Sequence, residues 1–227
     1  MAHHFRWNLG INNHICVRIP DRPDHFLMNP FGLGWDEVTA SNLATVKQGG
    51  EIVSHDGIKL GPAGLNFHSG ILRSRPEINC TFHVHARPGV AVAATKQGLS
   101  IVDQSGMHLY GEVGTHDFEG FAEGADEVPR ILRDLGDKHC LLMWNHGLLT
   151  IGRTIAESFL YMRRLVDACE LQISLMSMGA EIRHIPQDVL ETTRKQIMKK
   201  RENPRYAQTD WDYHCRQAAR LFPEFAD

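Results

Sequence analysis

The feature that most constrains the fold is a short, wholly apolar segment, residues 140–144, Cys-Leu-Leu-Met-Trp. A strand without polar residues has both faces covered, as in sheets that carry helices on each side. Along the rest of the chain, short apolar or β-branched segments alternate with segments of helical periodicity. The sequence therefore predicts an α/β fold, a three-layer α/β/α sandwich around a mixed, largely antiparallel sheet.

Turn and cap residues divide the chain into expected elements. We expect strands at residues 14–19, 26–29, 81–86, 99–103 and 140–144. We expect helices at residues 36–46, 65–73, 88–98, 125–135 and 154–179. Thr154 and Glu157 have the spacing of a capping box at the start of the last helix, and Gly179 ends it. No linker divides the chain, so we expect one domain over residues 1–227, with a core at about 11–179 and a C-terminal helical tail at 187–227.

The composition narrows the class of protein. The 227 residues suit one domain, and a hydrophobic fraction of 42% is enough for a real core. A formal net charge of −3 without a long basic run gives no support for a nucleic-acid or membrane-surface partner. No apolar run approaches the about 20 residues of a membrane-spanning helix. Five cysteines, an odd number without a CxxC pair, together with a polar N-terminus, predict reduced thiols in a cytoplasmic protein.

Two histidines share one expected strand, in Thr-Phe-His-Val-His-Ala at residues 81–86. Side chains alternate between the faces of a strand, so His83 and His85 point the same way, and Phe82 and Val84 point into the core. Imidazoles about 7 Å apart along a strand can converge on one metal ion at about 2.0–2.1 Å each. An HxH pair by itself is more often two ordinary core or surface histidines.

A third histidine favours the metal interpretation. His146 follows the apolar strand and precedes Gly147, and sites in α/β sheets collect at the carboxyl ends of strands. Gly147 and Gly152 are expected to permit the tight turn that brings His146 over the sheet end. Three histidine ligands leave positions on the metal open for substrate or water, as catalytic sites require.

The segment at residues 66–87 with His83 and His85, then Asn-His-Gly-Leu-Leu from Asn145 and a capped helix, resembles the class II aldolase/adducin family. The resemblance covers residues from about 11 to about 179. The family includes L-fuculose-phosphate aldolase and L-ribulose-5-phosphate 4-epimerase. The resemblance implies an α/β/α fold, a homotetramer with sites at subunit boundaries, and one divalent metal ion on His83, His85 and His146. Zinc is the first expectation for that ion, and manganese and iron stay open.

The sequence departs from the sugar-phosphate members of this family. Their Ser-Ser-Glu segment, four residues ahead of a helix histidine, falls here at Pro62, Ala63 and Gly64, ahead of His68. The serines help to hold phosphate in those enzymes, and the glutamate is a metal neighbour and acid/base. The pattern here resembles instead the adducin-like bacterial branch, and it favours a small-molecule substrate without phosphate.

The resemblance and the spacing also suggest further site residues. His68 is a candidate for moving protons, since its ordinary pKa is about 6.5, and His108 and Tyr110 follow an expected strand near the metal histidines. These three are the candidate catalytic residues. The candidate substrate-binding residues are His14, Asn29, Gly32, Gly64 and Arg87.

Three functions are compatible with these residues. The first is a metal-dependent carbon–carbon lyase, catalysing retro-aldol cleavage or decarboxylation of a non-phosphorylated keto or hydroxy carboxylic acid, including aromatic ones. The second is a three-histidine Fe(II) oxygenase on the same fold. The third is a non-catalytic interaction protein of the adducin type.

Overall fold

The structure is a computed structural model that describes residues 1–54, 57, 59–120 and 126–227. Its centre is a seven-stranded sheet in the order β3-β2-β1-β4-β7-β6-β5, in which only the pairing of β5 with β6 is parallel. The strands are β1 (His14–Ile19), β2 (Arg22–Met28), β3 (Ala44–Lys47), β4 (Cys80–Val84), β5 (Val113–His116), β6 (Cys140–Met143) and β7 (Gly147–Gly152). The expected mixed, largely antiparallel sheet is confirmed.

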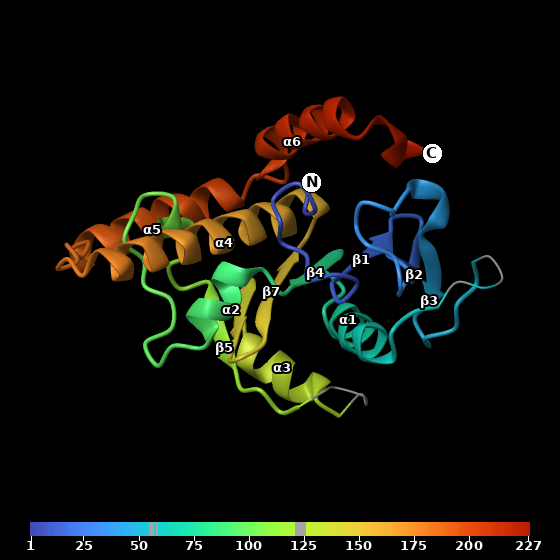
Figure 1. The fold of residues 1–227 in the computed structure, drawn as a ribbon, viewed down its shortest axis with the longest axis horizontal. Helices are drawn as coiled ribbons and strands as arrows, with labels where there is room; N and C mark the ends of the chain where they lie inside the picture. Colours follow the sequence, from blue (N-terminus) through green and yellow to red (C-terminus); the bar gives the residue numbers. More distant parts are fainter. Residues whose placement is uncertain (55–56, 58, 121–125) are drawn as a thin grey trace.

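Helices cover both faces of this sheet (Figure 1). The α-helices are α1 (Pro62–Ser74), α2 (Arg87–Ala93), α3 (Val128–Leu135), α4 (Ile155–Met178), α5 (Gln187–Arg201) and α6 (Gln208–Leu221), and the 3-10 helices are η1 (Ala40–Asn42), η2 (Gly106–Leu109) and η3 (Pro223–Ala226). Helices α1 and α3 pack on one face, and α2 and α4 pack on the other. The α/β/α sandwich predicted from the sequence is therefore confirmed.

The apolar strand β6 supplies both cores, as its composition requires. Leu141 and Met143 lie in the core under α1 and α3, whereas Cys140 and Leu142 lie in the core under α2 and α4. All four side chains are buried. Removing apolar surface from water contributes about 25 cal/mol per Å² to the free energy of folding. Because β6 is buried on both sides, it is a main source of stability.

The neighbouring strand β4 has one apolar face and one polar face. Phe82 and Val84 pack into the core under α4, while Thr81 and His83 face α1. The expected alternation at residues 81–86 is confirmed, although the strand itself ends at Val84 and His85 follows it. One face of β4 is thus left for polar chemistry.

Two expected elements are wrong. Residues 36–46 form no α-helix: Thr39 and Asn42 satisfy each other's polar groups around η1, and β3 then pairs with β2. Residues 99–103 form no strand, because side chains take the place of a partner strand there. Gln172 of α4 accepts a hydrogen bond from the Ser100 N–H. The Asp103 carboxylate accepts from the N–H groups of Ser105 and Gly106 in the turn that follows.

Other boundaries differ by a few residues. Helix α2 ends at Ala93 and not at Gly98, and α3 begins at Val128, whereas its expected start at residue 125 lies outside the described residues. Helix α4 begins as expected, with the Thr154 side chain accepting from the Glu157 N–H. The Glu157 carboxylate accepts from the Arg153 N–H, one residue before the position that a complete capping box would use.

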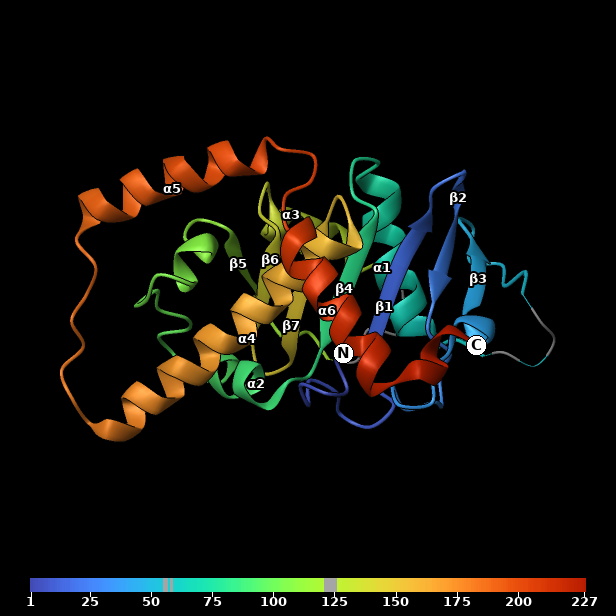
Figure 2. The ribbon, with the colours of Figure 1, turned by 90° about the horizontal axis from the view of Figure 1, so that it is seen from above.

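The chain continues past α4 into two further helices: α6 lies across α4 (Figure 2), whereas α5 packs against η2. Arg201, in the last turn of α5, is buried and forms an ion pair with Glu112 at 3.0 Å. Glu157 of α4 lies 3.8 Å from the same guanidinium group. This buried network ties α5 to the sheet and to α4, because breaking one partner would leave an uncompensated charge. Among the described residues, no helix is both long enough and apolar enough to cross a membrane.

Candidate metal centre

Three histidine side chains converge at one end of the sheet. His83 is the fourth residue of β4, His85 follows that strand, and His146 lies in the turn between β6 and β7. One ring nitrogen from each lies within 4.8 Å of the others. The ring centroids are 4.6 Å apart for His83 and His85, 4.8 Å for His83 and His146, and 5.0 Å for His85 and His146. The structure thus brings together the three residues that the sequence singled out.

The backbone at the turn explains the position of His146. Asn145 adopts a left-handed conformation, with φ of 55°, and its N–H donates to the Ala93 carbonyl of α2. Gly147 is needed for a different reason than the sequence suggested: a Cβ there would lie 2.5 Å from the Val84 carbonyl oxygen. Glycine at this position lets β7 approach β4 closely, and asparagine supplies the left-handed residue of the turn.

Hydrogen bonds orient the two strand histidines. His83 Nδ1 lies 2.9 Å from the Leu148 carbonyl oxygen, which can only accept, so Nδ1 carries the hydrogen and Nε2 keeps its lone pair. His83 Nε2 lies 3.2 Å from His85 Nε2. Two nitrogens bound to one zinc ion at about 2.0–2.1 Å in tetrahedral geometry are about 3.3 Å apart. The donor atoms of His83 and His85 therefore have the spacing that a single divalent ion requires.

The trio is also in the correct protonation state for a metal. Burial lowers the pKa of His146 to about 4, with interactions with His85 and His116 adding to the effect. Burial lowers the pKa of His85 as well and holds the pKa of His83 well below its usual range. The His85 Nδ1 atom is buried without a hydrogen-bond partner among the described residues. Neutral imidazoles with free lone pairs fit a divalent cation, which binds only deprotonated histidine.

A row of polar side chains extends from the trio toward α1. The His14 ring packs against His83, with centroids 5.2 Å apart, and its Nδ1 lies 3.0 Å from His68 Nε2. His68 Nδ1 lies 2.6 Å from Thr81 Oγ1. His68 is fully buried, and burial holds its pKa well below the usual range. His68 therefore reaches the trio through His14.

Gly64 makes room for His14. A Cβ at Gly64 would lie 3.0–3.1 Å from three atoms of the His14 ring, closer than ordinary van der Waals contact. Burial lowers the pKa of His14 to about 4, and interactions with His85 and His146 contribute. The His14 ring thus borders the trio and occupies the space that a side chain at position 64 would enter.

The remaining substrate-binding candidates have different surroundings. The Asn29 amide donates to the Asn13 carbonyl and accepts from the Ile15 N–H, so it holds the start of β1 in place. Gly32 lies in an exposed turn after β2, with φ of 100°. Arg87 is exposed at the first position of α2, two residues after His85. Of these three, Arg87 has the freedom to meet a ligand.

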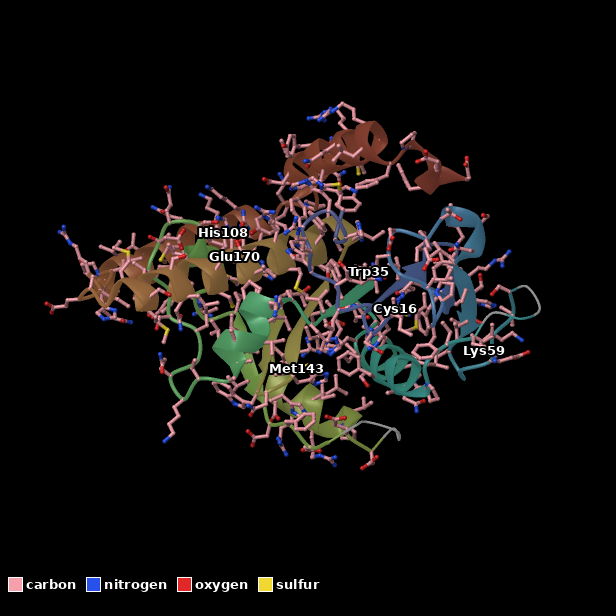
Figure 3. All side chains as sticks on the ribbon, viewed as in Figure 1. Cys16, Trp35, Lys59, His108, Met143 and Glu170 are labelled. Atoms are coloured by element: carbon pink, nitrogen blue, oxygen red, sulfur yellow. The ribbon has the colours of Figure 1, made fainter. Side chains whose placement is uncertain are left out.

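Two of the candidate catalytic residues lie elsewhere in the chain. His108 Nδ1 is 3.0 Å from the Tyr206 hydroxyl, and the Tyr110 hydroxyl donates to Glu191 of α5. In Figure 3, His108 lies beside α4 and α5, whereas Met143, three residues before His146, lies toward α3. The chain therefore does not bring His108 and Tyr110 to its own trio, because η2 packs against α4 and α5.

Two residues of the site carry roles that the sequence did not assign. The Asn13 side-chain oxygen accepts from the His85 N–H at 3.1 Å, which fixes the backbone of a proposed ligand. Thr81 anchors His68. Thr81 precedes His83 by two residues and so shares its strand face, and this spacing could have identified Thr81 as a site residue from the sequence. The partnership of Asn13 with His85 depends on the pairing of β1 with β4 and has no local signal.

Comparison with known proteins now identifies the family. The family model described as Class II Aldolase and Adducin N-terminal domain matches residues 1–173. The chain belongs to the class II aldolase and adducin family. A Pseudomonas aeruginosa protein whose name places it among the class 2 aldolases is 39% identical over 191 residues, 84% of this chain and 73% of that protein. Rat alpha-adducin is 39% identical over 180 residues, 78% of this chain but 24% of the adducin.

Solved structures agree with this assignment. An aldolase II superfamily protein from Pseudomonas syringae superimposes with a TM-score of 0.92 at 35% identity, over 100% of this chain and 90% of that one. An L-fuculose 1-phosphate aldolase from Glaciozyma antarctica gives 0.77 at 29% identity, over 86% of this chain and 76% of that one. Membership of this family supports metal-dependent, lyase-type chemistry on a small molecule in general.

The first prediction concerns metal occupancy. The protein should bind about one divalent ion per chain, and His146→Ala should reduce occupancy sharply, because two imidazoles hold an ion far less tightly than three. Metal content is measured after dialysis by mass spectrometry. His184→Ala, which changes an exposed histidine outside the site, is the control. Full metal content in His146→Ala would disprove the assignment.

The second prediction concerns pH. A histidine whose pKa is lowered by folding stays unprotonated as the pH falls from its ordinary value of about 6.5 toward the folded value. The trio should therefore bind Zn²⁺ with almost no proton release between about pH 5.5 and 6.5, below the pKa of about 7 of zinc-bound water, whereas exposed histidines would release protons in this range. Calorimetry in buffers of different ionisation enthalpy measures this release. One or more protons released per ion at about pH 6 would contradict the described burial.

Proposed function

We propose that the chain is a metal-dependent carbon–carbon lyase, acting by retro-aldol cleavage or decarboxylation on a non-phosphorylated keto or hydroxy carboxylic acid, including aromatic ones. The observation that carries this proposal is the convergence of three neutral imidazoles with no carboxylate at Gly64. Neutral ligands leave the ion its full charge of +2, which favours an anionic, chelating substrate.

The start of α1 supports a substrate without phosphate. Helix α1 begins at Pro62 after Gly61, and no side chain caps its first turn. Pro62 and Ala63 carry no hydroxyl donors, and the Pro62 nitrogen carries no hydrogen. A phosphate needs several hydrogen-bond donors, whereas a carboxylate that chelates a metal ion needs fewer.

The residues of the chain divide the chemistry as follows. His83, His85 and His146 hold the ion, which we take to be zinc because three nitrogen donors and an open position suit it, with manganese or iron as alternatives. A divalent ion there supplies Lewis-acid charge for the electron pair released when a bond next to a carbonyl group breaks. Chain residues then place the substrate and move its proton.

The placement of substrate depends on the surroundings of the trio. His14 borders the trio, and Gly64 makes room for its ring. The proposal also assigns substrate contacts to Arg87, Asn29 and Gly32. His68, acting through His14, is the candidate for moving a proton. His108 and Tyr110 lie on the tail side of the chain and are therefore candidates for the site of a neighbouring chain.

The third prediction concerns substrate class. The metal-loaded protein should cleave a keto or hydroxy acid and leave phosphorylated ketoses unchanged. Gly64→Glu should weaken acid binding, because the new side chain displaces His14 and repels the carboxylate. It should not create sugar-phosphate cleavage, since the donors for phosphate would still be missing. A turnover screen over both substrate classes is the test, and efficient cleavage of a sugar phosphate without response to any carboxylic acid would overturn the proposal.

The same experiments separate the two alternatives. An Fe(II) oxygenase would contain iron and consume oxygen during turnover, so metal analysis and an oxygen electrode distinguish it from a lyase. The adducin relatives favour a non-catalytic interaction protein. That alternative requires no turnover of any acid and unchanged function after the metal has been removed.

The fourth prediction concerns assembly. The proposed function includes assembly into a cytoplasmic homotetramer with sites at subunit boundaries. Exposed apolar side chains at the end of α4 and on α6, such as Met178 and Tyr213, provide surface for contacts between subunits. Sedimentation velocity should show a tetramer, and activity should fall when dilution dissociates it. A fully active monomer would contradict the proposal.

A further inference from the structure

The row Thr81–His68–His14 ends at a carbonyl group, and this end favours one direction for its hydrogen bonds. The Thr81 hydroxyl oxygen lies 3.5 Å from the Cys16 carbonyl oxygen, which can only accept, so a hydrogen bond across this long contact runs from Thr81 to Cys16. The Thr81 oxygen then accepts from His68 Nδ1 at 2.6 Å. All three members are polar side chains on facing surfaces of α1, β1 and β4, and Thr81 and His68 have no measurable exposure.

The same direction continues to His14. A neutral imidazole carries one hydrogen, so a His68 ring that donates through Nδ1 must accept through Nε2. The nitrogen facing His68 Nε2 at 3.0 Å is His14 Nδ1, which therefore carries the His14 hydrogen. The opposite direction would leave the contact between Thr81 and Cys16 unmade. His14 Nε2 is left with a lone pair, and no hydrogen bond from the described part of the chain reaches it.

The position of the His14 ring decides where this lone pair lies. The ring packs between His83 and the bare backbone of Gly64, with Nε2 among the three atoms nearest to the space above Gly64. It is half-buried beside the trio. The acceptor left on this ring therefore lies beside the trio, next to the space that a side chain at position 64 would fill.

We propose that Thr81 and His68 hold His14 in the Nδ1–H tautomer, so that His14 Nε2 accepts a hydrogen bond from the hydroxyl group of a chelating 2-hydroxy acid. This assignment rests on the proposed function, and it narrows the substrate class within it. A keto oxygen or an ether oxygen has no hydrogen to offer to His14 Nε2 and is disfavoured there. His68 and Thr81 are positioning residues that act through His14.

The first arm of the test measures the tautomer in the metal-free protein, independently of any ligand. Long-range proton–nitrogen NMR of the ¹⁵N-labelled chain at about pH 7, where the ring is neutral, reports which ring nitrogen carries the hydrogen, and His14→Gln identifies the His14 signals. His14 should be a single Nδ1–H tautomer. Thr81→Val should make it a mixture, and Thr81→Ser should restore it. An Nε2–H tautomer in the unmodified protein would overturn the proposal.

A matched control comes from the other face of the sheet. Thr150 of β7 is equally buried, and its hydroxyl bonds to Ser158 of α4. Thr150→Val removes a buried hydroxyl without touching the row, so the His14 tautomer should not change. If the His14 tautomer changed as much in Thr150→Val as in Thr81→Val, the cause would be general loosening of the sheet. The proposal that Thr81 and His68 set the tautomer would then be wrong.

The second arm uses glycolate and methoxyacetate, which share a carboxylate but differ in the hydroxyl hydrogen. Calorimetry on the Zn²⁺-loaded protein should show tighter binding of glycolate by about threefold to tenfold, the range of one neutral hydrogen bond. Thr81→Val should reduce this ratio, and Thr150→Val should preserve it. An unchanged ratio in Thr81→Val would overturn the proposed role of His14 and leave the proposed function intact. No binding of either acid would overturn the proposed function and this inference with it.

Discussion

The close approach of β7 to β4 is the contact on which the rest of the site depends. It is possible because Gly147 has no side chain opposite the Val84 carbonyl oxygen. The pairing places Leu148 beside His83, whose ring it orients, and it places the preceding turn so that His146 faces both strand histidines. A tight turn with Asn145 in a left-handed conformation completes the arrangement. The convergence of the three histidines is thus a consequence of sheet geometry more than of any local motif.

The polar face of β4 imposes a second constraint, because imidazoles buried under α1 must be neutral and hydrogen-bonded. The fold satisfies them in two groups. His83 donates to a carbonyl oxygen, and His68 and His14 are linked in a row that starts at Thr81. Gly64 is part of this solution, since a larger residue there would displace His14. The absence of an acid at position 64 and the presence of a histidine at position 14 are therefore one structural feature.

Much of this could be predicted from the sequence where the signal is local. The alternation around His83 and the cap at Thr154 depend on neighbouring residues only, and both are found in the structure. The predicted helix at residues 36–46 and the predicted strand at residues 99–103 were wrong, because distant partners decide the conformation of both segments. Pairing with β2 decides the first, and the Gln172 side chain decides the second. The contact of His14 with His83 and that of Asn13 with His85 depend on the register of β1 against β4, which no local pattern encodes.

The central claim is that three neutral imidazoles form one catalytic divalent-metal site. The most direct measurement is X-ray absorption at the metal edge of protein purified without chelators or metal-affinity resin. We expect about one zinc ion per chain, with three imidazole nitrogens at about 2.0–2.1 Å and a remaining position filled by oxygen. A protein without stoichiometric metal, or a metal whose ligands include sulfur and lack the imidazole pattern, would contradict the account.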